Sequence, residues 1–292
     1  MKTLTLQALA ARPPLRHNIG DMPRTLARDA LGLGLRTRHY RELGEPWPEL
    51  DYFEIISENF LSEAEGPRYH LDRVRERYPI VLHGVGLNLL GPEPPSTDYL
   101  DRVAALAELV DAPFVTDHLC WTGSHGLSHH DLLPVPYVPE LVELAAARAR
   151  HVQQHLGRPF GLENLSSYVE FVASTMTEWD FYAQVVERAG CGFMLDINNI
   201  YVSSQNHRFS PADYLARIDL SRVLQVHIAG HTREPNGTII DTHDHPVADA
   251  VWQLYGNAFR QQPFPTLLEW DDHIPPLAEA VAELRRAEVV RV

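Results

Sequence analysis

Cysteine is scarce in this chain of 292 residues, and its placement excludes two kinds of cysteine-based structure. Cys120 and Cys191 are the only cysteines, and they lie far apart in the sequence. They form no C-x-x-C pair, so neither a disulfide framework nor a thiolate zinc site is indicated. We expect two reduced thiols.

Basic charge and long apolar runs are also scarce. Lysine and arginine total 25 against 39 acidic residues, a formal net charge of −14. This balance disfavours a protein that binds the phosphate backbone of nucleic acids. No run approaches the ~20 apolar residues of a membrane span, and arginine and proline interrupt the N-terminal residues where a signal peptide would have its apolar core. We therefore expect a soluble, cytoplasmic protein with no nucleic-acid partner and no membrane segment.

Short apolar runs recur along the chain, and most are followed by a helical pattern. Continuous apolar runs are typical of strands buried on both faces. Helical spacing is clearest over Thr97–Val110 and Pro139–Leu156, whereas residues 44–50, GEPWPEL, read mostly as a loop. The alternation predicts one (β/α)8 barrel. We expect a single domain over 1–292, with its core at about 30–290 and an N-terminal extension over 1–29. A doubly wound sheet is the alternative, but its G-x-G-x-x-G turn is absent. The eight runs are Ala30–Arg36, Tyr52–Glu58, Pro79–Gly86, Pro113–Cys120, Pro159–Ser166, Cys191–Asn199, Val223–Gly230 and Pro265–Asp272.

Polar residues gather where these runs end. In (β/α)8 barrels, that end of the strands carries the chemistry. A lone Asp at a strand end is commonly a helix cap, but polar ends on six strands would bury many carboxylates together, at a high electrostatic cost. Bound metal ions remove that cost, so the pattern predicts a metal centre. Imidazole, carboxylate and amide ligands suit iron, manganese or catalytic zinc. Nine candidate ligands are too many for one ion and suit two or three. We expect His118, His231, His245 and Asp271 to orient them through hydrogen bonds.

Eight motifs in order resemble one known family. They are HGVGLNLLG, VTDHLCW, HDLLPVPY, GLENLSSY, MLDINNIYVSSQNH, VHIAGH, DTHDHP and LLEWD, between about Gly32 and Asp272. Together they resemble the multinuclear non-haem iron-dependent oxidases, which include the methanobactin biosynthesis oxidase. Each motif alone is weak, but eight in sequence order are specific.

The resemblance implies a fold, a ligand set and a reaction. The fold is a barrel similar to the xylose isomerase and apurinic endonuclease group. By position, the resemblance implies two or three irons in mixed ferrous and ferric states, with ligands at His83, Asp117, Glu163, Asp196, Asn199, His227, Asp241, His243 and Glu269. Such enzymes use O2 to modify cysteines of ribosomally made precursor peptides. They commonly work with a small partner protein that recognises the leader of the precursor.

Two other function classes stay open. A zinc or manganese hydrolase or isomerase could use the same barrel, although Lys2 is the only lysine and such isomerases usually employ one at the metal site. A non-catalytic metal-binding protein is the third reading. Cys120 could neighbour the site or be a small buried residue. The Ser124–Tyr137 loop could line a substrate channel or present solvated histidines, and Trp121 and Tyr137 could grip a peptide or pack in the core.

Overall fold

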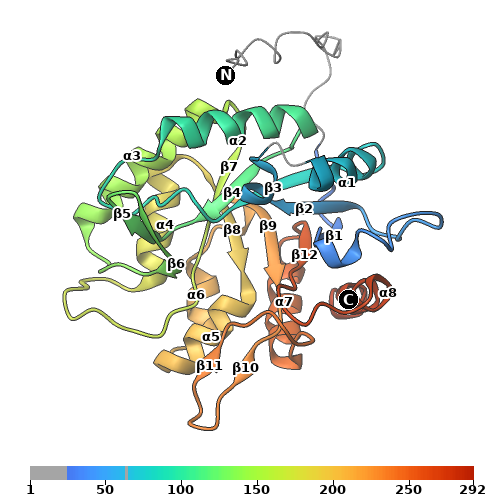
Figure 1. The fold of residues 1–292 in the computed structure, drawn as a ribbon. Coiled ribbons are helices and arrows are strands. Elements are labelled where there is room, and N and C mark those ends of the chain that lie inside the picture. Colours follow the sequence, from blue (N-terminus) through green and yellow to red (C-terminus); the bar gives the residue numbers. More distant parts are fainter. Residues whose placement is uncertain (1–24, 63–64) are drawn as a thin grey trace, which may run out of the picture.

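The fold is a closed barrel of eight parallel strands, which confirms the predicted architecture. The computed structural model describes residues 25–62 and 65–292. Neighbouring barrel strands are paired in the order β1-β12-β9-β8-β7-β4-β3-β2 (Figure 1). Each strand lies inside one of the eight predicted runs. The strands are β1 (Leu31–Gly34), β2 (Tyr52–Ile56), β3 (Ile80–Gly84), β4 (Val115–His118), β7 (Phe160–Glu163), β8 (Gly192–Asp196), β9 (Val223–Ile228) and β12 (Thr266–Leu268).

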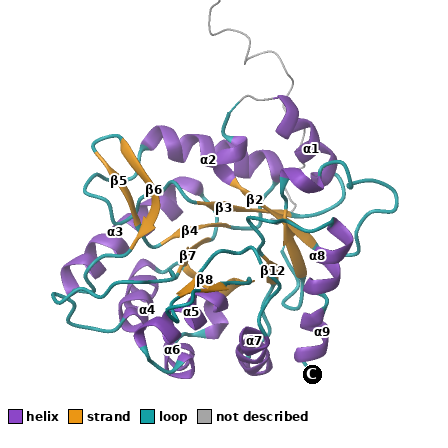
Figure 2. Cartoon of the chain, turned by 60° about the horizontal axis from the view of Figure 1, so that its bottom comes forward, coloured by secondary structure: helices purple, strands orange, loops and turns teal. Residues whose placement is uncertain are grey.

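Helices surround the barrel and cover the outer faces of its strands (Figure 2). The helices predicted over Thr97–Val110 and Pro139–Leu156 are confirmed with those bounds. Their ends carry the expected signals: the Ser96 side chain caps α2, and Gly157 ends α3 with a φ of 61°. In the described ranges no helix is long and apolar enough to span a bilayer. The α-helices are α1 (Glu65–Arg75), α2 (Thr97–Val110), α3 (Pro139–Leu156), α4 (Glu178–Ala189), α5 (Ile197–His207), α6 (Pro211–Arg217), α7 (Asp249–Gln261), α8 (Leu277–Leu284) and α9 (Arg286–Val290).

The connection between β1 and β2 departs from strict alternation, as its two prolines predict. It carries the short 3-10 helix η2 (Thr37–His39) and otherwise runs as loop and turn through residues 44–50. Most of the expected N-terminal extension over 1–29 lies outside the described residues. The single-domain organisation therefore stays a prediction.

Two β-hairpins that the sequence patterns do not predict are inserted after β4 and β9. The first joins β5 (Trp121–Ser124) to β6 (Leu127–Leu133), and the second joins β10 (Thr232–Arg233) to β11 (Ile239–Ile240). Both leave the carboxyl end of a barrel strand, so they extend the rim at which a barrel carries its site (Figure 1).

Apolar side chains fill the barrel at its amino-terminal end. Tyr52, Val81, Phe114 and Leu267 pack together there and are almost completely buried. Gly32 on β1 leaves room for the Tyr52 ring, because a β-carbon at Gly32 would collide with it. With this end closed, polar chemistry is confined to the carboxyl ends of the strands.

A carboxyl group at the start of α4 makes stability depend on pH. Burial raises the pKa of Glu178 from its ordinary 4.5 to about 7, and Tyr214 donates a hydrogen bond of 2.9 Å to Glu178 Oε1. The folded state therefore holds a proton that the unfolded state releases, and stability falls as pH rises from 4.5 to 7. Above pH 7 we expect Glu178→Gln to raise the free energy of unfolding by roughly 1–2 kcal/mol, because it removes a buried negative charge. Partial contact of the carboxyl group with water keeps this gain small.

Urea unfolding of both proteins at pH 5 and pH 8 checks this expectation. The gain should shrink towards pH 4.5, where the carboxyl is protonated in both states. Glu76→Gln, at an exposed position after α1, is the matched control. An equal increase in the free energy of unfolding at pH 5 and pH 8 would contradict the raised pKa of Glu178.

Candidate metal centre

Eight polar side chains, one from each barrel strand or the residues just after it, lie together at the carboxyl end of the barrel. None has more than 7% of its surface exposed. Charged groups withdrawn from water in this way are unfavourable unless they are paired or bind metal. The eight are Arg36, Glu54, His83, His118, Glu163, Asp196, His227 and Glu269.

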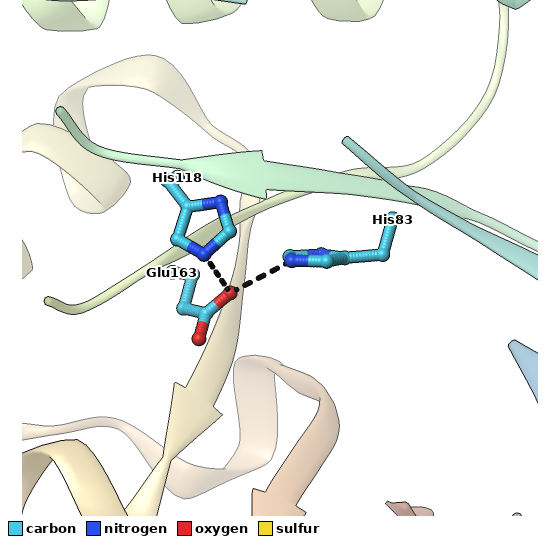
Figure 3. A group of neighbouring side chains, drawn as sticks. All are labelled: His83, His118 and Glu163. Atoms are coloured by element: carbon cyan, nitrogen blue, oxygen red, sulfur yellow. Dashed lines mark ion pairs between the residues drawn. The ribbon is translucent and has the colours of Figure 1, made fainter. Parts of the chain in front are cut away.

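His83, His118 and Glu163 form the first of four overlapping groups that could hold a metal ion (Figure 3). The Nε2 atoms of His83 and His118 lie 3.1 and 3.0 Å from Oε2 of Glu163. Each Nδ1 faces an acceptor: His118 Nδ1 lies 3.0 Å from Gly84 O, and His83 Nδ1 lies 2.8 Å from Thr116 Oγ1. With the proton on Nδ1, each Nε2 keeps a lone pair that points at the centre of the group.

One of the other three groups shares Glu163 with the first, and these three share members with one another. They are Glu163, Asp196 and His227; Glu54, His227 and Glu269; and Asp196, His243 and Glu269. Within each group, the ligand atoms lie within 4.8 Å of one another. Glu163, Asp196, His227 and Glu269 each belong to two groups, so the four groups form adjacent candidate sites.

The cluster perturbs the acidity of its own members. Burial disfavours the charged imidazolium of His83, but the Glu163 carboxylate outweighs it and raises the pKa of His83 to about 9. Burial likewise opposes ionisation of Glu163, yet His118 and His83 hold its pKa below the ordinary value. Burial and the Asp241 carboxylate raise the pKa of Asp196 well above its usual range. Histidines and carboxylates thus neutralise one another where no cation is bound.

Asp117 and His118 lie on opposite sides of β4. Asp117 was expected among the ligands and His118 behind them, whereas the structure brings His118 into the cluster and leaves Asp117 out. Successive strand residues face opposite ways, so an inward His118 sends Asp117 outward. There Asp117 Oδ2 accepts hydrogen bonds of 3.3 Å from Leu87 N and 3.4 Å from Tyr99 OH. Burial, with the Glu58 carboxylate, raises the pKa of Asp117 to about 8.

This arrangement predicts opposite metal phenotypes for neighbouring substitutions. We expect Asp117→Asn to keep the metal content of the parent protein, because its side chain lies outside the barrel. His118→Ala should lose about one ion per chain. Elemental analysis of both variants after anaerobic purification checks this. Loss of metal from Asp117→Asn alone would make Asp117 the ligand instead.

The structure brings Asn199, Asp241 and His243 to the same cavity from the segments after β8 and β9. His243 Nε2 lies 2.7 Å from Asp241 Oδ1, and its Nδ1 lies 3.4 Å from Glu269 Oε2. Asn199 Nδ2 lies 3.5 Å from Glu163 Oε1. Its backbone N–H donates a 2.6 Å hydrogen bond to Asp196 Oδ1, so this carboxylate also caps α5.

Sequence reasoning missed Glu54 as a ligand, although it is completely buried beside His227. Glu54 Oε2 lies 3.0 Å from His227 Nε2, and Gln225 also contacts both side chains. One signal in the sequence could have found it: a charged residue stands inside the apolar run YFEII. A strand buried on both faces is otherwise apolar, so a charge within it indicates a functional role.

The residues expected to orient ligands behave differently from one another. Asp271 Oδ2 lies 3.1 Å from His243 Nδ1, and its Oδ1 accepts a 2.7 Å bond from Arg36. His231 contacts Asn198, whose amide donates to Asp241, so it acts one step further out. His245 is exposed and pairs with Asp244 at 2.5 Å.

Comparison with known proteins identifies the family. Residues 30–291 match the family described as "RiPP precursor modification enzyme MbnB/TglH/ChrH". The chain belongs to this family. A UPF0276 protein of Caulobacter vibrioides is 48% identical over 258 residues, which cover 88% of this chain and 92% of the relative. A UPF0276 protein of Anaeromyxobacter sp. is 46% identical over 261 residues, covering 89% and 92%.

Solved structures support the fold of this RiPP precursor modification enzyme family at low sequence identity. A D-tagatose 3-epimerase-like protein matches with a TM-score of 0.57 and 15% identity, covering 90% of this chain and 97% of that one. Endonuclease IV from Thermus thermophilus matches with a TM-score of 0.57 and 16% identity, covering 90% and 98%. At this identity, the likeness concerns the barrel alone.

Cys120 is completely buried after β4. Burial, with Asp117 and Glu163 nearby, raises the pKa of its thiol well above the ordinary value. The group is therefore a neutral thiol, which is the less reactive form.

The Ser124–Tyr137 loop contains most of the β5–β6 hairpin and combines the two roles left open for it. Its residues Leu132 and Leu133 line the cavity of about 400 Å³ above the metal groups. His125 and His129 are exposed. Trp121 packs edge-on against His129, and the ring of Tyr137 is tilted against that of Phe181. The loop thus lines part of the cavity and also carries exposed histidines.

Proposed function

We propose that this protein is a multinuclear non-haem iron enzyme that uses O2 to modify cysteine residues of a ribosomally synthesised precursor peptide. Membership of a RiPP precursor modification family supports a peptide substrate. The observation that carries the metal-dependent part is the set of four overlapping, fully buried groups of histidine and carboxylate.

The residues fit bound metal ions better than a closed hydrogen-bond network. Within the described part of the chain, five buried ligand atoms have no hydrogen-bond partner: Glu54 Oε1, Glu163 Oε2, Asp196 Oδ2, Asn199 Oδ1 and His243 Nε2. Two of these atoms lie within 3.1 Å of a neighbouring ligand atom, yet the geometry is not that of a hydrogen bond. Buried polar atoms are rarely left unpaired in folded proteins. Bound cations would give these atoms partners.

The proposed ligands follow from this geometry and differ from the sequence-based set at β4 and β2. His118 takes the place of Asp117, and Glu54 is added. Iron bound there would take up a substrate thiolate and O2 and supply the redox chemistry. Imidazole and carboxylate ligands without a protein thiolate suit iron, and bridging carboxylates suit two or three ions. The proposed ligands are Glu54, His83, His118, Glu163, Asp196, Asn199, His227, Asp241, His243 and Glu269.

The remaining polar residues hold these ligands in place. Arg36 donates to Glu269 at 3.2 Å and to Asp271 at 2.7 Å, which fixes both carboxylates. Gly84 and Thr116 set the tautomers of His118 and His83. The closed lower barrel leaves the 400 Å³ cavity as the approach for a cysteine side chain. A small partner protein that recognises the leader of the precursor completes the proposal.

Metal content and oxidation state test the proposal first. Elemental analysis and Mössbauer spectroscopy of anaerobically purified protein should give two or three irons per chain in mixed ferrous and ferric states. Tightly held zinc or manganese, with hydrolytic turnover and no O2 consumption after iron loading, would instead favour a hydrolase on the same barrel.

A further inference from the structure

An exposed apolar segment lies next to the metal cavity. Four of the five residues from Tyr168 to Val172 are large and apolar, and the fraction of their surface that is exposed runs from 37% for Phe171 to about 100% for Val172. They belong to the loop between β7, which carries Glu163, and α4. Soluble proteins seldom group exposed apolar side chains in this way without a binding role.

The loop holds these side chains in a fixed position. At its start, Ser167 N donates to Ser203 Oγ at 3.0 Å, and Ser167 Oγ lies 2.8 Å from His207 Nε2. Tyr168 OH accepts a 3.0 Å hydrogen bond from the backbone N–H of Asp241, a residue of the metal centre. At its end, Thr175 N donates to Tyr137 O at 2.9 Å. The exposure is therefore part of an anchored conformation.

A second cavity, of about 640 Å³, opens on the far side of this segment. Met176, Trp179 and Phe209 form its apolar wall. It meets the metal cavity at Val169, which lines both. Its volume is within the range of ligand pockets and larger than one side chain needs.

We propose that this second cavity binds an apolar side chain of the precursor peptide at a fixed number of residues from the modified cysteine. This inference rests on the proposed function and extends it to substrate specificity. A peptide whose cysteine reaches the metals must leave the metal cavity over one of its walls. The wall at Tyr168–Val172 is apolar, anchored and continuous with a hollow, so it favours a peptide with an apolar residue there. An apolar residue on a partner protein, or on a second copy of the chain, is the competing occupant.

A peptide display experiment tests the proposal on the metal-loaded protein without O2. The probe is a library of linear peptides with one central cysteine and five random positions on each side. We expect Trp, Phe, Leu or Met to be enriched at one fixed offset from the cysteine. Val172→Asp and the cavity-filling Met176→Trp should weaken the selected peptides about tenfold or more, as expected for one buried apolar side chain. Val289→Asp, at another exposed valine, on α9, should bind like the parent protein.

The outcomes separate this proposal from the proposed function. Cysteine-dependent binding with no preferred apolar position would still agree with the proposed function, but it would show that the second cavity is not a subsite for the peptide. Apolar enrichment that survives a cysteine-to-serine library would keep the subsite and count against cysteine as the target. Enrichment unaffected by both cavity variants, or no enrichment at all, would overturn the subsite and favour a partner protein or a second copy there. Unchanged metal content in the variants shows that the metal centre is intact.

Discussion

Glu163→Ala is expected to remove more bound metal than substitution of a ligand that belongs to only one of the four groups. Glu163 belongs to two of the four metal groups and contacts His83 and His118 through one oxygen atom. Without Glu163, the buried imidazoles of His83 and His118 have no carboxylate beside them. The neighbouring group of Asp196 and His227 loses its third member. We expect about two ions per chain to be lost, and activity to fall well over 100-fold, since disturbing even a residue behind a metal ligand costs 10–100-fold.

The measurement is metal content by elemental analysis, compared with His118→Ala, which should lose only one ion because His118 belongs to one group. Glu76→Ala, an exposed glutamate after α1, controls for the loss of a negative charge. Circular dichroism shows whether the barrel is still folded. Equal metal loss in Glu163→Ala and His118→Ala would mean that Glu163 does not bridge two sites.

The order of elements could be read from the sequence because each barrel strand is a continuous apolar run. Prolines and polar residues limit these runs, and two helices have clear end signals, so their bounds agree with the structure. The hairpins at β5–β6 and β10–β11 were not predicted. Most of the residues in their strands are exposed or half-buried, so burial imposes no alternating apolar pattern on them.

The sequence does not show which residues of each strand point into the barrel. A strand buried on both sides is apolar at odd and even positions alike, so nothing in VTDH says whether Asp117 or His118 points inward. Packing decides it, since β4 must present His118 to Glu163 on β7. Glu54 was missed for a related reason: it lies within its strand, among apolar residues, and only barrel closure brings it to His227.

Removing the metal is expected to destabilise the protein strongly without unfolding it. An ion present at about 1,000 times its dissociation constant adds ~4 kcal/mol to the free energy of unfolding. For two ions, and about 2 °C per kcal/mol in a large domain, the melting temperature should fall by roughly 15 °C. The metal-free barrel should still fold, because His227 lies 3.0 Å from Glu54 and 2.9 Å from Glu269, so the buried charges remain paired. Calorimetry before and after dialysis against a chelator checks this.

The pH dependence of the metal-free protein shows whether these pairs replace the metal. The Glu163 carboxylate raises the pKa of His83 from 6.5 to about 9 against the effect of burial, so its ion pair stabilises the fold fully below pH 6.5 and is lost as pH rises towards 9. Asp196 acts in the same direction, since burial and Asp241 raise its pKa and its ionisation becomes a burden as pH increases. The metal-free melting temperature should therefore fall between pH 6.5 and 9. The metal-loaded protein should change little there, because ligand histidines are already neutral and bound carboxylates already ionised. Parallel curves for the two forms would mean that the metal binds elsewhere than in this cluster.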